Sequence, residues 1–578
     1  MKNATDLPRA PRRRRLTLWI SIAVFLVLVG AGLWVGIRGA SAADELSTAR
    51  TLAARLQSEM MSGNAKDAAV TLEKVGTHTA TALELTSDPV WRAMELIPFA
   101  GPNLVAVRES ARAVDDMVTG VATPLLPLTG DLDAGSFAGA SIPIQPLVDA
   151  APMAKEAREA AESISDRVSQ IEANRTLPFV RDAVLELTGL VTQVTETVQS
   201  IDRATTVLPG MLGADGPQNY LVLFQNNAEL RASGGLPGAT AVLTATNGVL
   251  TLSSQRSTLD YPKLAQPVLP LTAAESGLHG AILGRYIQDV NLTPDFSRTG
   301  ELAKAMAEPV VGIPLDGVLA IDPYVLSYVL AATGPVELAD GSMLTSENAV
   351  KLLLSDVYAT IPDSRAQDAF FASVTNRVFN VLSSRAVDPA KLLRAIGQSG
   401  DEGRVRLWSA DPAEQKVIEE TTLAGVPAEE SEAVLGVYLN DATGGKMDYY
   451  LTTTVALSCG EEEQRVTVKL ANGAPQDAAT SLTPYVTGNG VYGVPPGSIR
   501  TQVLVILPPG ARAVLRAGSD SAVLRDDAGR VVVSQYLELQ AGRSDTVVVN
   551  YADASPTRIT TTPGLKVNSP ERGQAPCS

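Results

Sequence analysis

The run from Leu16 to Ile37 contains no charged residue and directly follows a block of four arginines, Arg12 to Arg15. A helix of that length crosses a hydrocarbon core of roughly 30 Å. Trp19 and Trp34 lie near its two ends, where amphipathic rings favour the membrane interface. The pattern predicts a transmembrane helix over residues 16–37, preceded by a cytoplasmic basic tail over residues 1–15.

A cleaved signal peptide is the alternative, because Ala40-Ser41-Ala42 resembles a small-residue cleavage site. The apolar run is longer than the usual signal core of about 7–15 residues, which favours an uncleaved anchor. The prediction is therefore a single-pass protein of the cell membrane, with a cytoplasmic N-terminus and its ectodomain outside. Both cysteines, Cys459 and Cys577, fall in that ectodomain, where an oxidising exterior permits one disulfide between them.

Composition limits the function classes. The chain of 578 residues carries a net charge of −16, which disfavours a nucleic-acid binder. It has two histidines, so a histidine-rich metal site is excluded. Its length predicts several domains.

The pattern of apolar residues changes twice along the ectodomain. Residues 43–205 keep helical spacing and predict an all-α stalk or bundle. Short apolar runs mixed with helices predict a central α/β domain over residues 216–446. Residues 447–555 predict a β-sandwich, and residues 556–578 a loosely ordered tail. The clearest helical seam has 4-3-4-3 steps typical of a coiled coil: Val180, Val184, Leu187, Val191, Val194, Val198 and Ile201.

The polar string from Gln225 to Gly235 directly follows the first apolar run of the central domain, Tyr220 to Phe224. Its arginine, Arg231, supplies a fork for phosphate or carboxylate, and its glycines let backbone N–H groups approach an anion. The other candidate ligand-binding residues are Asn226, Asn227, Glu229, Ser233, Gly234 and Gly235. The alternative is a polar turn in which Arg231 pairs with Glu229 or Asp260.

Two further arginines stand at predicted element ends. Arg256 follows the next strand, and Arg365 lies where a helix opens, together with Gln367, a further candidate ligand-binding residue. Three arginines at element ends fit a pyrophosphate pocket, although a single one is more often a surface residue. Asp289 and Asp295 are candidate ligands for Mg²⁺, the one cofactor we predict, and the alternative is that they form turns.

The order of these segments resembles the LytR–CpsA–Psr phosphotransferase domain. The corresponding strings are Arg231-Ala232-Ser233-Gly234, Ser254-Gln255-Arg256-Ser257, Val290-Asn291, Gly312-Ile313-Pro314-Leu315-Asp316, Gly334-Pro335-Val336 and Asp363-Ser364-Arg365-Ala366-Gln367. The resemblance implies an α/β fold and transfer of a glycopolymer by Arg231, Arg256 and Arg365. The sequence departs from the family at Ser233 and Ser257, where family members carry acidic residues.

A second string, Leu439 to Tyr450, together with Gln225 to Gly235, resembles an uncharacterised family of single-pass envelope proteins from Gram-positive bacteria. Asn440, Asp441, Lys446 and Asp448 either add polar groups to the central site or form a polar hairpin packed between the central and β domains.

The leading hypothesis is an envelope protein that binds a polyprenyl-(pyro)phosphate-linked glycan and transfers it to a cell-wall acceptor. The partners implied are the membrane, that lipid-linked glycan, and peptidoglycan or envelope assembly proteins. The alternative is a non-catalytic envelope scaffold with a degenerate phosphotransferase-like domain. A surface adhesin rests on the terminal β domain alone.

Overall fold

The structure is a computed structural model that describes residues 12–61, 64–127, 141–384, 389–425, 433–460, 463–514, 521–556, 558–564 and 567–568. The chain forms two compact units. The helical unit comprises Met1–Asp133 and Gln145–Leu208, and the C-terminal unit comprises Ala134–Ile144 and Pro209–Ser578.

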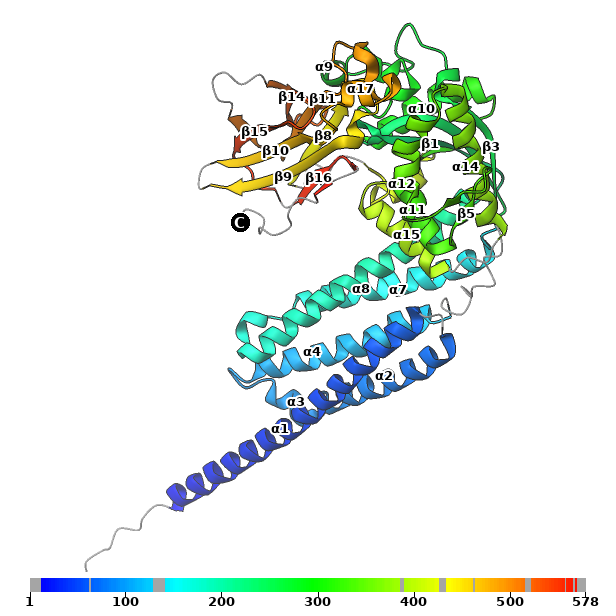
Figure 1. Cartoon of the computed structure of the whole chain (residues 1–578). Coiled ribbons are helices and arrows are strands. Elements are labelled where there is room, and N and C mark those ends of the chain that lie inside the picture. The colour runs from blue at the N-terminus through cyan, green and yellow to red at the C-terminus, as the bar shows by residue number, and fades with distance from the viewer. Residues whose placement is uncertain are drawn as a thin grey trace, which may run out of the picture. The chain divides into compact units, whose positions relative to one another are not determined.

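The first helix, α1 (Arg12–Met61), is continuous from the basic block into the helical unit (Figure 1). No Gly-Pro or polar turn interrupts residues 38–43, so the predicted membrane helix and the start of the predicted stalk lie on one helix. Within the described residues, one helix is long and apolar enough to cross a membrane, over Phe25–Met60, a property that anchors share with signal sequences.

The predicted helices of residues 43–205 are present. The seam residues Val191 and Val198 pack with Ala157, Ala161 and Ile164 in one core, so the seam serves contacts within the unit. After α1 the elements are α2 (Ala65–Thr86), α3 (Pro89–Met94), α4 (Gly101–Met117), η1 (Val118–Ala122), α5 (Thr123–Leu125), α7 (Gln145–Ser169), η2 (Ala173–Arg175) and α8 (Pro178–Met211).

The C-terminal unit begins with a mixed five-stranded sheet in the order β3-β2-β1-β4-β7. The central pair β1 and β4 is parallel, and the other neighbours are antiparallel. Asn247 and Gly248 have positive φ angles at the β2–β3 turn, as the two-residue hairpin signal predicts. The strands are β1 (Gln218–Arg231), β2 (Gly234–Thr246), β3 (Val249–Ser257), β4 (Gly317–Ile321) and β7 (Arg406–Ser409).

Helix α10 (Phe296–Val311) covers one face of this sheet. Phe296 and Leu302 share a core with Leu221, Leu223 and Val318 of β1 and β4. The remaining elements of this region are η3 (Thr258–Asp260), α9 (Ala273–His279), η4 (Ala281–Gly284), η5 (Ile287–Asp289), α11 (Pro323–Thr333), β5 (Val336–Glu337), β6 (Met343–Leu344), α12 (Ala349–Lys351), η6 (Leu352–Asp356), α13 (Val357–Thr360), α14 (Ser364–Ser384), α15 (Pro389–Asp401) and α16 (Pro412–Glu419).

Two further five-stranded sheets, β13-β14-β11-β8-β16 and β12-β15-β10-β9-β17, share one core and form the β-sandwich. Its strands are β8 (Val434–Asp441), β9 (Leu451–Cys459), β10 (Gln464–Asn472), β11 (Ile499–Ile506), β12 (Arg512–Val514), β13 (Ala522–Arg525), β14 (Val531–Leu539), β15 (Ser544–Ala552), β16 (Arg558–Thr561) and β17 (Val567–Asn568). Between them lie η7 (Met447–Tyr450), α17 (Ala478–Ser481), α18 (Pro484–Thr487) and η8 (Gly488–Gly490).

The sandwich therefore begins at Val434 rather than at residue 447, and β16 pairs with β8 where the sequence predicted the start of a loose tail. Cys459, at the end of β9, is disulfide-bonded. Cys577 lies outside the described residues, so its pairing with Cys459 stays a prediction.

The sandwich core also receives side chains from the central region. Leu230, Val357 and Tyr358 are buried in the same apolar cluster as the sandwich strands. The sheet and the sandwich thus form one packed unit at the far end of β1.

Candidate functional site

The polar string lies on a strand rather than in a loop. Strand β1 pairs with β4 as far as Phe224 and Ile321 and then continues, paired only with β2, to Arg231 opposite Gly234. The register shifts between Asn226 and Leu230, so the strand bulges there. We call residues 225–237 the β1–β2 extension. Its string from Gln225 to Gly235 is buried throughout, which differs from the open site expected at a strand exit.

Glu229 on the bulge forms an ion pair with Lys446, with 2.5 Å between Oε2 and Nζ. The lysine ammonium also lies 5.5 Å from the ring centre of Tyr358 and 5.3 Å from that of Tyr485. Burial opposes the charge of Lys446, but the Glu229 carboxylate outweighs it, so the pKa of Lys446 is raised. The ammonium of Lys446 therefore stays charged at neutral pH.

Arg231 pairs with Asp289, not with Glu229 or Asp260 as the alternative reading supposed. Its Nη2 lies 3.1 Å from Asp289 Oδ1, and its Nη1 donates to the backbone oxygen of Leu230. Burial raises the pKa of Asp289, and Arg231 partly counteracts that shift. The Arg231 side chain is 10% exposed and is held inside the protein.

Strand β8 and the turn after it bind the backbone of the extension. Asp448 Oδ2 accepts from Leu230 N at 2.8 Å, and Asn440 Oδ1 accepts from Ala232 N at 2.8 Å. Asp441 instead caps its own turn, where it accepts from Thr443 N and Gly444 N. The string from Leu439 to Tyr450 thus packs the central sheet against the sandwich, as the second reading of these residues had it.

The two aspartates of this turn hold protons more tightly than usual. Burial raises the pKa of Asp441 to about 6. Burial, with the like charge of Asp441, raises the pKa of Asp448 well above its usual value. The cavity that Asp448 shares with Leu230 and Thr562 measures about 10 Å³, which is room for one water molecule. A neutral Asp448 fits this closed space, and a pyrophosphate does not.

The remaining polar residues of the extension also have structural partners. Asn226 donates to Tyr358 Oη, and Asn227 donates to the backbone oxygen of Pro563. Ser233 donates to Thr293 O, and Asn291 donates to Gly235 O. A Cβ on Gly235 would lie 2.3 Å from Asn226 C, and Gly234 has φ +140°. The glycines therefore serve the tight hairpin, not the approach of an anion.

Arg256 and Arg365 lie elsewhere. Arg256 is opposite Thr240 of β2, six residues from Gly234, which corresponds to about 20 Å of extended strand from the level of Arg231. Arg256 is half-buried, and its Nε has no hydrogen-bond partner among the described residues. Arg365 is exposed at the start of α14.

Carboxylates accompany Arg365. Burial raises the pKa of Asp368 on α14, with further influence from Ser257, Asp260, Arg365 and Asp363. Carboxylates of α14 therefore lie near Arg365. Gln367, a candidate ligand-binding residue, is buried and donates to Ile361 O at 2.7 Å, so it stabilises the α13–α14 turn.

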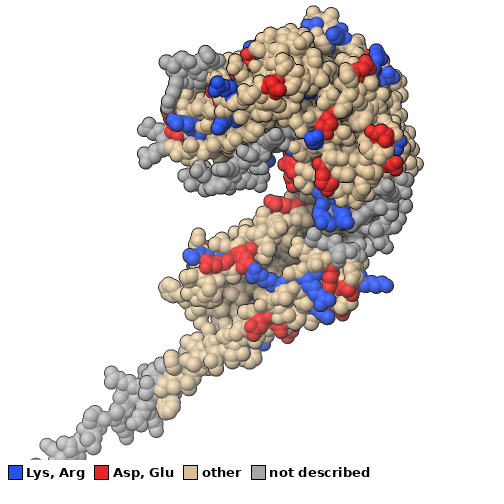
Figure 2. Space-filling view, in the orientation of Figure 1, with Lys and Arg blue, Asp and Glu red and all other residues tan. Residues whose placement is uncertain are grey.

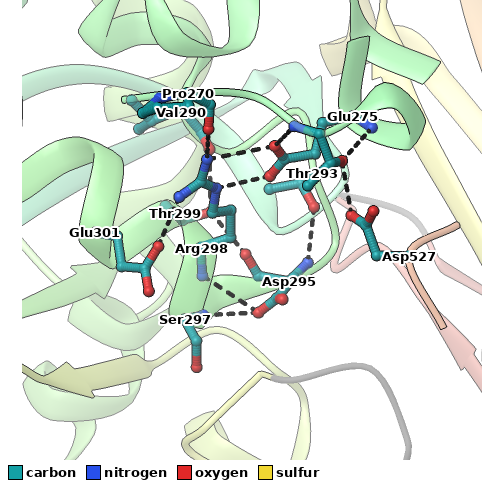
Figure 3. Close-up of polar contacts among 11 residues, drawn as sticks. Pro270, Glu275, Val290, Thr293, Asp295, Ser297, Arg298, Thr299, Glu301 and Asp527 are labelled. Atoms are coloured by element: carbon teal, nitrogen blue, oxygen red, sulfur yellow. Dashed lines mark hydrogen bonds and ion pairs between the residues drawn. The ribbon is translucent and has the colours of Figure 1, made fainter. Parts of the chain in front are cut away.

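The two candidate Mg²⁺ ligands, Asp289 and Asp295, bind different protein groups. Asp289 binds Arg231. Asp295 points to the start of α10 and accepts from Ser297 N and Arg298 N (Figure 3). Among the described residues, no group of three or more His, Cys, Asp or Glu side chains is placed to hold a metal. The Mg²⁺ assignment gains no support here.

Sequence reasoning missed a second buried ion pair at the end of β4. Arg404 Nη1 lies 2.8 Å from Asp322 Oδ2, and its Nη2 donates to the backbone oxygen of Gly564. Asp322 also caps α11, where it accepts from Tyr324 N and Val325 N. Nothing in the spacing of the two residues signals their pairing, because they are far apart in the chain.

Comparisons with known proteins identify part of the chain. Residues 215–358 match the family described as Protein of unknown function (DUF4012). This match agrees with the resemblance to an uncharacterised family, and it covers β1 to α13. No curated protein matches the chain.

Two solved structures show a distant likeness. The transcriptional regulator yvhJ from Bacillus subtilis is 12% identical, with 35% of this chain and 76% of that chain covered and a TM-score of 0.21. Protein gbs0355 from Streptococcus agalactiae is 12% identical, with 37% and 76% covered and a TM-score of 0.25. These scores are too low to carry an argument, and neither protein is described as a LytR–CpsA–Psr phosphotransferase.

Proposed function

We propose that the protein is a single-pass membrane protein of the cell envelope whose C-terminal unit is a non-catalytic interaction scaffold. The observation that carries this proposal is the burial of the whole polar string. Arg231, Glu229 and their neighbours bind one another and the backbone, so they join the sheet to the sandwich and are not available to a ligand.

Packing of α1 supports an anchor over a cleaved signal peptide. The candidate cleavage segment, residues 40–42, lies inside the helix, and Ala42 is fully buried against Ala82 and Ala111. Cleavage there would cut a continuous packed helix. With Arg12 to Arg15 on the cytoplasmic side, the ectodomain lies outside.

The sandwich offers a surface for a partner. An open hollow of about 710 Å³ is lined by Arg512, Arg525 and Arg530, among other residues. Asp553 and Asp526 pair with Arg512 and Arg530, and Arg525 is exposed. The exposed Arg525 in this hollow suits an anionic partner, such as an acidic protein segment or a wall polymer.

The second candidate function is binding of a polyprenyl-(pyro)phosphate-linked glycan and its transfer to a wall acceptor. One observation favours it: Arg256 has an unpartnered Nε and lies near the start of α14 with Arg365. The carboxylates near Arg365 weigh against it, because they compete with an anion for that arginine.

One experiment separates the two functions. The intact protein is extracted in mild detergent, and co-purified lipid is identified by native mass spectrometry, in wild type, in Arg256→Ala/Arg365→Ala and in Arg543→Ala, an exposed-arginine control. Arg231 is left intact because its loss would disturb the core. The scaffold predicts no polyprenyl phosphate in any sample. Such a lipid in wild type and the control, but not in the double variant, would establish the second function instead.

The scaffold also predicts a partner. Crosslinking in cells followed by purification should recover one reproducible partner from wild type and from Arg543→Ala. Arg512→Ala/Arg525→Ala should lose it. If wild type yields no reproducible partner, the scaffold proposal is wrong.

A further inference from the structure

Two loops at one end of the helical unit expose large apolar side chains. The α3–α4 loop carries Leu96 and Phe99, which are 85% and 94% exposed. Leu177 before α8 and Phe179 in its first turn are 52% and 72% exposed. Each place has an aliphatic residue, a proline and a phenylalanine in a row, Ile97-Pro98-Phe99 in the α3–α4 loop and Leu177-Pro178-Phe179 at the start of α8. We call Leu96, Phe99, Leu177 and Phe179 the apolar tip.

The two loops are fixed to each other by one side chain. Asn103 donates through Nδ2 to Phe99 O at 3.0 Å, and its Oδ1 accepts from Leu177 N at 2.7 Å. Phe99 has φ +69°, a conformation that costs energy for a non-glycine residue. The structure therefore holds these apolar side chains outward in a defined geometry, although their exposure to water is unfavourable.

The apolar tip lies at the level of the apolar run of α1. Ala42 of α1 and Ala111 of α4 share a buried cluster and so lie at one level. Gly101, at the start of α4, is ten residues before Ala111, which is about 15 Å along a helix. The same distance back along α1 from Ala42 reaches Gly32, inside the uncharged run Leu16–Ile37.

A second set of contacts places the apolar tip at the same level along α1. Trp34 donates to Asp88, and Arg38 pairs with Asp88 at 3.0 Å, so the turn before α3 lies beside the outer end of the apolar run. Gly39 lies beside the ring of Trp91 in α3. The chain then enters the loop that carries Leu96 and Phe99. In Figure 1, the α3–α4 loop and the α7–α8 turn lie at the same end of the helical unit.

From this placement we propose that the apolar tip inserts into the lipid bilayer beside α1, at the boundary between headgroups and acyl chains. The inference rests on the proposed membrane anchor. Continuity with α1 identifies the occupant as lipid: Figure 2 shows the described part of α1 that protrudes from the unit as a surface without Lys, Arg, Asp or Glu. Aromatic side chains favour this boundary. The tip would fix the helical unit against the membrane at three points: α1 and the two loops.

Depth-dependent quenching tests the proposal in the full chain. Phe99→Cys and Phe179→Cys are labelled with the environment-sensitive fluorophore NBD, without reductant so that disulfide-bonded Cys459 stays unlabelled. Val70→Cys is the matched control, because Val70 is 52% exposed and lies on α2, twelve residues on the other side of Ala82 from the tip. Leu28→Cys in the apolar run reports on the anchor.

Each labelled protein is reconstituted into phosphatidylcholine–phosphatidylglycerol vesicles with or without nitroxide-labelled lipid. We expect blue-shifted emission and at least twofold quenching by nitroxide at positions 99, 179 and 28, and little change at position 70. Emission at 99 and 179 that matches position 70, with position 28 quenched, would overturn the tip proposal and leave the anchor standing. Loss of quenching at position 28 as well would refute the anchor itself.

A protein surface covering the tip has its own signature. Positions 99 and 179 would then be shielded from the aqueous quencher iodide but would not be quenched by the nitroxide lipid. This result would also overturn the lipid proposal. Circular dichroism of each variant checks that the helical unit is folded, which exposed positions should permit.

Discussion

Replacing Lys446 with methionine should destabilise the C-terminal unit strongly. The Lys446 and Glu229 side chains are only 9% and 10% exposed. Methionine keeps the length of the lysine stem, so packing against Tyr358 and Tyr485 changes little. The loss is electrostatic, because the Glu229 carboxylate stays buried without its cation. Breaking one partner of a buried pair costs about 3–5 kcal/mol, a large part of a typical domain stability of about 5–15 kcal/mol.

The chain provides a matched control. Lys351 pairs with Asp356 at 2.7 Å, but these side chains are 66% and 38% exposed. Lys351→Met removes the same chemical group from a solvated pair and should cost about 0–1 kcal/mol. The assay is urea unfolding of the full chain in mild detergent, followed by pulse proteolysis so that fragments of the C-terminal unit are counted separately.

The double variant Glu229→Gln/Lys446→Met completes the test. It removes both charges, so it should recover at least half of the loss caused by Lys446→Met alone. The reasoning is refuted if Lys446→Met is no less stable than Lys351→Met, or if the double variant is as unstable as the single one.

Three further changes test the interior of the C-terminal unit. Burial lowers the pKa of His279 to about 4. As pH falls from about 6.5 to 4, His279 is therefore protonated in the unfolded chain but not in the folded chain. Stability should fall through that window by up to about 3 kcal/mol, and urea titrations of His279→Gln should lack this part of the fall. Asp441 has the opposite sign: its pKa is raised to about 6, so the folded chain holds a proton that the unfolded chain loses above about pH 4. Wild type should therefore gain stability relative to Asp441→Asn as pH falls from 7 to 4, and no change in that difference would contradict the burial of Asp441. In α10, a Cβ on Gly300 would lie 2.5 Å from the Trp408 ring, so Gly300→Ala should lower the free energy of unfolding by about 1–3 kcal/mol. A Cβ on Gly277 in α9 would have no atom within 4 Å, so Gly277→Ala should show no such loss when thermal melts of the two variants are compared.

Local signals in the sequence predicted local structure well. Asp322 and Pro323 open α11 as an N-cap and a first-turn proline should. The seam on α8 packs as its spacing predicts. These features depend on neighbours within a few residues, so the sequence contains all the information they need.

The predictions that differ from the structure concern long-range pairing. Val434 begins a strand of the sandwich because β11 and β16 lie on its two sides, and neither is near it in sequence. Arg231 was expected to bind a ligand, but its carboxylate partner Asp289 follows much later in the chain. A string of polar residues looks the same in sequence whether it faces a ligand or another domain. Only the position of β8 distinguishes the two.

The buried polar network around Glu229 extends beyond the residues of the family match. The match over residues 215–358 ends at Tyr358, which receives the Asn226 hydrogen bond and lies under the Lys446 ammonium. Lys446, Asp448 and Asn440 come from outside the match, yet they satisfy Glu229, Leu230 N and Ala232 N inside it. A fragment limited to residues 215–358 would expose Leu230 and leave the Glu229 charge unpaired. The matched segment is therefore not an independent domain. It is the part of a larger folding unit that carries the β1–β2 extension, and the segment from β8 to η7 is the rest of the same core. A function assigned to the matched residues alone would overlook the sandwich on which their conformation depends.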